Sequence, residues 1–126
     1  MPRTSRQCVT ASSLTPDVPV RPVRLRERAA NDIEQAVSYH LAEADTEVAL
    51  RFVDAVERTV RQIGRSSQAG SLRFSYELEI PGLRVRPLGR FPYLVFYVVG
   101  DDVVDVWRVL HNRRDIPTAM DDEIGA

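Results

Sequence analysis

Two stretches in the first half of the chain repeat apolar residues at the three- and four-residue spacing of an amphipathic helix. The first predicts a helix over residues 28–43. The second predicts a helix that begins at a cap formed by Asp45 or Thr46 and ends near Gly64. Because only a few residues separate them, we expect an antiparallel helical hairpin. The repeating positions are Ala29, Ile33, Ala36, Val37 and Leu41 in the first helix, and Ala49, Phe52, Val53, Val56, Val60 and Ile63 in the second.

Four other segments have the pattern of strands. Residues 23–26 and 83–86 alternate apolar and charged side chains, and residues 93–99 and 103–110 are β-prone runs joined by the turn sequence Gly100-Asp101-Asp102. The order β-α-α-β-β-β predicts an α+β fold in which the helical hairpin packs on one face of a small, mainly antiparallel sheet. We expect residues 65–82 to be mostly loop, with a short extended segment at 73–78. The other sheet face should stay uncovered and available to a partner.

The ends of the chain differ from its centre. Residues 1–22 contain four prolines, several Ser and Thr, and little periodicity, which predicts a disordered N-terminal extension. An overlong gene assignment, with the true start near Val18 or Val20, is the alternative. The domain should occupy residues 23–117, and residues 118–126 should form a frayed, acidic C-terminal tail.

Composition narrows the class of protein. The chain has 126 residues, 44% of them hydrophobic and 28% charged, which is typical of one globular domain. The longest apolar run, residues 93–99, is far shorter than a membrane helix requires, and the first thirty residues lack an apolar signal-peptide block. We therefore expect a cytoplasmic protein with no membrane partner. One cysteine, two histidines and no glycine-rich phosphate loop predict no metal and no cofactor.

The charge is unevenly distributed. All 17 basic residues are arginine, and the net charge is −1. Residues 59–90 nevertheless carry six arginines against two glutamates, and the stretch from Arg84 to Arg90 has three arginines and no acid. Arginine stays charged when desolvated and grips carboxylate or phosphate with a planar fork. We therefore expect a local basic surface on the uncovered sheet face, facing an acidic partner.

Two segments near the end of the chain resemble a known family. The run from Arg90 to Tyr97 reads RFPYLVFY and follows Gly89, and the run from Trp107 to Asp115 reads WRVLHNRRD and precedes Ile116-Pro117. Together with the helix pair, these segments resemble the ParE/RelE toxin superfamily, in its ParE-like branch, over residues 23–117.

This resemblance implies the toxin of a type II toxin–antitoxin module, connected with growth inhibition, stress response and plasmid stabilisation. The partner would be a cognate, ParD-like antitoxin that neutralises the toxin, and operator DNA would be bound only through that antitoxin. ParE-like members bind DNA gyrase and have no established chemistry of their own. The residues expected to bind the target or the antitoxin are Arg84, Arg86, Arg90, Arg108, His111, Arg113, Arg114 and Asp115.

Two alternatives stay open. RelE-like members are ribosome-dependent, metal-independent mRNA endonucleases, and the catalytic candidates here would be Arg90, Arg108 and His111. The chain has no lysine and no tyrosine after residue 97, which departs from the RelE pattern. A degenerate, non-toxic binding module is the other alternative. Simpler structural roles also remain: His111 as a hydrogen-bonding turn residue, and Arg113, Arg114 and Asp115 as a surface ion-pair cluster.

Overall fold

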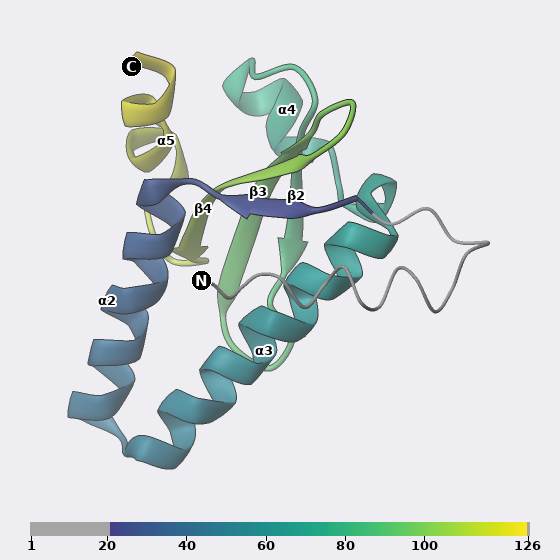
Figure 1. Ribbon diagram of the computed structural model, residues 1–126. Coiled ribbons are helices and arrows are strands. Elements are labelled where there is room, and N and C mark those ends of the chain that lie inside the picture. The colour runs from purple at the N-terminus through teal and green to yellow at the C-terminus, as the bar shows by residue number, and fades with distance from the viewer. Residues whose placement is uncertain (1–20, 126) are drawn as a thin grey trace.

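The fold is built on a four-stranded sheet with the strand order β1-β4-β3-β2 (Figure 1). The computed structural model describes residues 21–125, and their side chains as far as Met120. The first strand runs parallel to the last, and the other neighbours are antiparallel. The predicted β-α-α-β-β-β order and its three-stranded meander are confirmed. The strands are β1 (Val23–Leu25), β2 (Leu83–Pro87), β3 (Tyr93–Val99) and β4 (Val104–His111).

The predicted helical hairpin covers one face of this sheet. It consists of α2 (Glu27–Glu43) and α3 (Thr46–Arg65). The α3 cap is the predicted one, because Oδ1 of Asp45 accepts a hydrogen bond from the Val48 N–H at 2.9 Å. Apolar side chains of both helices form a buried cluster with the strands beneath them. Its buried members are Ala29, Ala36, Phe52, Ala55, Val56, Ile63, Leu88, Val95, Tyr97, Val104, Val106 and Val109.

The second face of the sheet is also covered, so the expectation of an uncovered face is wrong. A 3₁₀ turn, η1 (Ser67–Ala69), leads to the short helix α4 (Arg73–Leu78), and the chain ends in α5 (Ile116–Gly125). Figure 1 shows α4 and α5 at the top of the view, with the hairpin below them. Their apolar residues bury a second cluster, whose members are Phe74, Ile80, Leu83, Val85, Phe96, Leu110, Ile116, Ala119 and Met120.

The two segments that cover this face have a different secondary structure from the one predicted from the sequence. Residues 73–78 are helical rather than extended, and the segment after Pro117 is a helix in which Ala119 and Met120 are buried. Proline is tolerated in the first turn of a helix, where its missing N–H has no intrahelical partner. Both helices are too short for the apolar period to show clearly in the sequence.

A bulge in β4 changes which side chains face the hairpin. The β3–β4 register shifts between Phe96 and Tyr97, so that Phe96 pairs with Arg108 while Tyr97 pairs with Val106. Trp107 is the extra residue. Because of the shift, Val106 and Val109 both join the hairpin-side cluster although they are three positions apart, an offset that places residues of a regular strand on opposite faces.

The predicted N-terminal extension lies outside the described residues except for its last two. The Arg21 N–H donates to the Gly64 carbonyl at 3.0 Å, and the Pro22 carbonyl accepts from the Val104 N–H at 2.9 Å. These two residues therefore belong to the folded domain. Within residues 21–125, no helix has both the length and the apolar character needed to cross a membrane.

Candidate functional site

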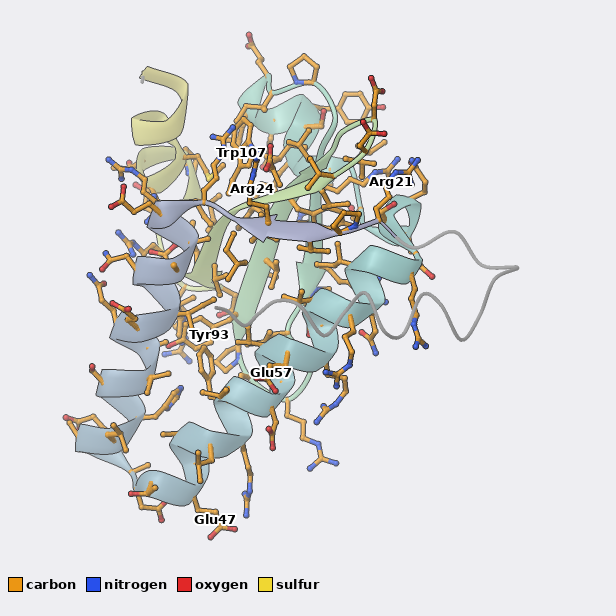
Figure 2. All side chains as sticks on the ribbon, viewed as in Figure 1. Arg21, Arg24, Glu47, Glu57, Tyr93 and Trp107 are labelled. Carbon is orange, nitrogen blue, oxygen red and sulfur yellow. The ribbon has the colours of Figure 1, made fainter. Side chains whose placement is uncertain are left out.

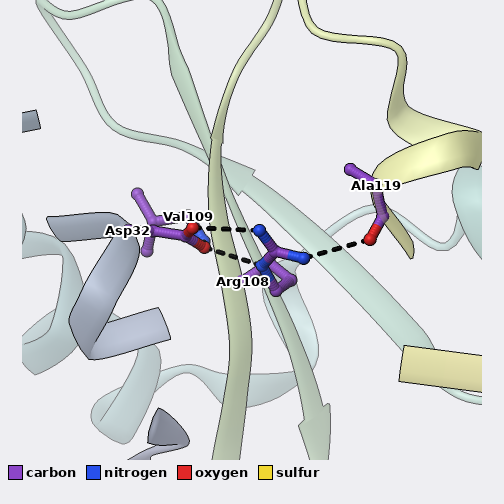
Figure 3. A network of polar contacts seen from close by, with 4 residues as sticks. All are labelled: Asp32, Arg108, Val109 and Ala119. Carbon is purple, nitrogen blue, oxygen red and sulfur yellow. Dashed lines mark hydrogen bonds and ion pairs between the residues drawn. The ribbon is translucent and has the colours of Figure 1, made fainter. Parts of the chain in front are cut away.

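Arg108, which was expected on a docking or catalytic surface, is buried in a network of polar contacts (Figure 3). Its Nε and Nη2 donate to the two carboxylate oxygens of Asp32 at 2.8 and 3.0 Å, and its Nη1 donates to the Ala119 carbonyl at 3.0 Å. The side chains of Arg108 and Asp32 are each only 6% exposed. Arg108 thus joins α2 and α5 to β4, and the structure places this predicted site residue in the interior of the domain.

The backbone of β4 explains why Asp32 is needed at this place. β1 pairs with β4 only from Val104 to Val106, so within residues 21–125 no strand lies beside the rest of β4 on that side. Asp32 Oδ2 accepts the Val109 N–H at 3.0 Å and so satisfies an amide that no strand reaches. One carboxylate therefore closes the sheet edge and neutralises the buried guanidinium.

The two arginines of β2 also fail to form an exposed basic face. Leu83 and Val85 alternate with them and pack in the second cluster, so Arg84 and Arg86 lie on the hairpin side of an edge strand. Arg84 donates to the carbonyls of Gln68 and Gly70, both at 2.8 Å, and to Oε1 of Gln68 at 2.8 Å. Its guanidinium is therefore held by the loop after α3.

Arg86 is half-buried beside Tyr97. The Arg86 Nη1 is buried without a hydrogen-bond partner among the described residues. Burial raises the pKa of the Tyr97 phenol, while the Gly70 N–H and the charges of Arg86 and Arg84 act in the opposite direction. The Tyr97 hydroxyl donates to the Ser67 carbonyl at 2.9 Å and accepts the Gly70 N–H at 3.1 Å. The Tyr97 hydroxyl therefore holds the η1 segment against the sheet through these two hydrogen bonds.

His111 ends β4 and holds the turn that follows. Its Nδ1 accepts the Arg113 N–H at 3.1 Å, and its ring contacts that of Tyr93 with centroids 5.1 Å apart. His111 therefore hydrogen-bonds the turn that follows β4, as the structural alternative in the sequence analysis proposed. Asp115 also acts locally, because its carboxylate accepts from the Thr118 hydroxyl at 2.8 Å and its carbonyl accepts the Ala119 N–H at 3.0 Å at the start of α5.

A hollow of about 380 Å³ lies between α2 and the end of β4. Its lining includes the imidazole of His111, the phenols of Tyr39 and Tyr93, and the guanidinium of Arg114. Burial raises the pKa of one of these phenols, that of Tyr93. The lining residues are Asp32, Gln35, Ala36, Tyr39, Tyr93, Val109, His111 and Arg114.

A second hollow, of about 460 Å³, lies between α3 and the β2–β3 turn. Arg90 lines this hollow together with Arg51, Arg58 and the half-buried Phe91. The sequence interpretation included Arg90 but missed the two arginines of α3. Their seven-residue spacing, which places side chains two helical turns apart on one side, was the signal that would have found them.

The predicted site residues therefore lie in several separate places. His111 and Arg114 line the α2 hollow, Arg90 lines the α3 hollow, and Arg108 is buried in the network with Asp32. The three catalytic candidates do not line one common hollow. Among residues 21–125, no cluster of three or more His, Cys, Asp or Glu side chains is arranged to hold a metal ion.

Comparison with solved structures gives the same fold. A chain from the structure titled "Chromosomal ParDE TA system from P. aeruginosa" superposes with a TM-score of 0.63 at 20% sequence identity, covering 73% of the present chain and 96% of the other. At this identity the match shows the fold alone. No curated protein matches the chain.

The family model described as "ParE toxin of type II toxin-antitoxin system, parDE" matches residues 23–116, which include the hairpin, the whole sheet and the His111 turn. This range covers most of the chain and agrees with the resemblance of the RFPYLVFY and WRVLHNRRD segments. The chain therefore belongs to the family of ParE toxins of type II toxin–antitoxin systems.

Proposed function

We propose that this toxin stops growth by binding DNA gyrase rather than by catalysis, and that a ParD-like antitoxin neutralises it. The observation that carries the choice is the burial of Arg108 against Asp32. Metal-independent RNA cleavage needs a base, a cation and an acid at one phosphate. Arg108 is the arginine that β4 carries close to His111, and its guanidinium is committed to internal contacts.

The two outer edges of the toxin's sheet differ in how open they are to an added antitoxin strand. The outer edge of β2 is occupied in part by Ser71, which exchanges two backbone hydrogen bonds with Val85 at 3.0 and 2.9 Å. On the opposite side, β1 is the last strand of the sheet among the described residues. We therefore place strand addition at β1, where backbone N–H and C=O groups of Val23 and Leu25 supply the pairing. The toxin–antitoxin complex would bind operator DNA through the antitoxin.

One observation favours a second candidate, RelE-like cleavage of mRNA on the ribosome. His111, Tyr93 and Arg114 line one hollow, and together they offer a proton acceptor, a proton donor and a cation. The Nδ1 of His111 is engaged by the Arg113 N–H, so proton transfer would have to use its other ring nitrogen.

The experiment that decides between them expresses the toxin with and without the protein encoded by the neighbouring small reading frame. Gyrase binding predicts an SOS response, filamentation and inhibited supercoiling by purified gyrase, all relieved by the antitoxin. Prompt loss of translation with cut transcripts, abolished by His111→Gln, would establish the second candidate instead. Full growth with soluble toxin present would refute both and support a degenerate binding module.

A further inference from the structure

His40 is the last residue of α2 that is partly buried. The last buried residue of this helix, Ala36, lies one turn earlier, and the first buried residue of α3 is Ala49. Residues 41–47, which connect the two helices, are all exposed, and we call them the hairpin tip. Figure 2 shows Glu47 at the far end of the hairpin, pointing away from the sheet. His40 therefore holds the α2 side of the tip to the body of the protein.

The His40 imidazole lies among four aromatic rings from different parts of the fold. On the hairpin, its ring centroid is 5.4 Å from that of Tyr39 in α2 and 5.1 Å from that of Phe52 in α3. On the sheet side, the distances are 5.4 Å to Phe91 in the β2–β3 turn and 6.2 Å to Tyr93 in β3. Figure 2 shows Tyr93 in the angle between α2 and α3. One imidazole thus connects both hairpin helices to the sheet.

This surrounding accepts the neutral imidazole and disfavours the charged one. The Nε2 of His40 is buried and has no hydrogen-bond partner among residues 21–125. A neutral ring carries one proton, and with that proton on Nδ1 the buried Nε2 is only an unused lone pair. Protonation adds an N–H donor at Nε2 without an acceptor and places a charge against rings instead of water. Burial accordingly lowers the pKa of His40.

No carboxylate compensates a charge on this ring. Among the ion pairs of the described residues, none includes His40. The titratable and charged residues around the cluster are Tyr39 and Glu43 of α2, Asp45 of the tip, Glu47, Arg51, Asp54 and Arg58 of α3, Arg90 of the β2–β3 turn, Tyr93 of β3, and His111 of β4, whose ring contacts Tyr93. All four acids in this set are exposed, and none of them hydrogen-bonds the buried Nε2.

We propose that His40 is an acid-sensitive latch, which keeps the hairpin tip closed while its ring is neutral and releases the tip when the ring is protonated. In the open tip the ring is in water and takes up its proton near the ordinary pKa of about 6.5. In the closed tip the ring takes up its proton only at lower pH. Opening is therefore favoured as pH falls below about 6.5, and the gain levels off once the closed ring is also protonated.

Release of the tip would change both hollows together. Tyr39 and Tyr93 line the α2 hollow, and Phe91 lines the α3 hollow. His40 contacts all three of these rings. A partner that uses either hollow would therefore bind in a pH-dependent way, whichever target the toxin has. The latch thus goes beyond the proposed function and does not rest on it.

The first measurement is an NMR titration of the full-length toxin from pH 8 to pH 5. The ring signal of His40 is assigned by its loss in His40→Phe, and we expect its pKa to lie below 6.5. The faces of aromatic rings also attract cations, which acts in the opposite direction. A pKa of His40 at or above 6.5 would show that this attraction outweighs burial, and it would overturn the inference.

The second measurement is hydrogen exchange at the base of the tip. The Ala44 N–H donates to the His40 carbonyl at 2.9 Å, so it exchanges when this turn opens. After correction for the intrinsic exchange rate, its opening equilibrium should rise at least about threefold between pH 7.5 and pH 5.0. The rise should be insensitive to low concentrations of urea, which is the mark of a local opening.

Two variants isolate the latch. His40→Phe keeps an aromatic ring and removes the titrating group, so exchange at Ala44 should lose its pH dependence. The matched control, His111→Gln, removes the other histidine of the chain and should keep the wild-type pH dependence. No rise in acid for the wild type, the same rise in His40→Phe, loss of the rise in His111→Gln, or a rise that grows with urea would each overturn the inference.

The wild-type titration and exchange decide the question even if His40→Phe fails to fold, because the ring signal is then assigned from His111→Gln. Neither measurement involves gyrase or the antitoxin, so failure here is distinct from failure of the proposed function.

Discussion

Replacing Asp32 by alanine should be among the most damaging single substitutions in this protein. The carboxylate accepts two hydrogen bonds from Arg108, at 2.8 and 3.0 Å, and a third from the Val109 N–H at 3.0 Å. Its removal leaves a guanidinium that is 6% exposed without its counter-ion, and leaves a buried edge amide without an acceptor. Breaking a buried pair on one side in this way costs about 3–5 kcal/mol of unfolding free energy.

That loss is large compared with the stability of a domain of this size, which is about 5–15 kcal/mol in total. Urea unfolding followed by far-UV circular dichroism measures it directly. We expect the midpoint of Asp32→Ala to fall sharply at an unchanged slope. The single variant Arg108→Met should lose a similar amount, because it leaves the carboxylate of Asp32 buried without its cation.

The double variant Asp32→Ala/Arg108→Met separates the pair from its surroundings. With both charges gone, the loss should be at least about 2 kcal/mol smaller than the sum of the single losses. Hydrogen exchange adds a second check, because Arg108→Met removes the contact to the Ala119 carbonyl and should release α5 first. A loss below about 1 kcal/mol for Asp32→Ala, or strictly additive losses, would refute this account of the network.

Three further predictions use the same unfolding assay. Gly70→Ala should destabilise by about 1–3 kcal/mol, because its Cβ would come within 2.3 Å of the Tyr97 hydroxyl oxygen, and the loss should shrink in a Tyr97→Phe background. Met120→Ala should cost about 2–5 kcal/mol, since this side chain is 0% exposed; a negligible effect would mean that α5 does not pack on the sheet. Burial lowers the pKa of His40, so the unfolded chain takes up a proton before the native state does. Stability should therefore decline as pH falls below about 6.5 and level off below the folded-state pKa, and His40→Phe should flatten that decline.

The sequence by itself determined the elements whose signal is local. The hairpin helices are long enough for the apolar period to repeat, and Asp45 caps α3 through a hydrogen bond that spans three residues. The strand from Tyr93 to Val99 has the predicted bounds because a continuous β-prone run ends at a glycine turn. The RFPYLVFY and WRVLHNRRD segments also identified the family that the family model confirms.

Only the tertiary structure decided which charged side chains stay exposed. The exposure of an arginine depends on groups that are distant in sequence: Asp32 lies 76 residues from Arg108, and Gln68 lies 16 residues from Arg84. The bulge at Trp107 and the short helices α4 and α5 determine which groups lie beside these arginines. None of the three features leaves a periodic signal in the sequence. Apolar periodicity is a property of neighbouring residues, whereas the pairing of a charge is a property of whatever the folded chain brings beside it.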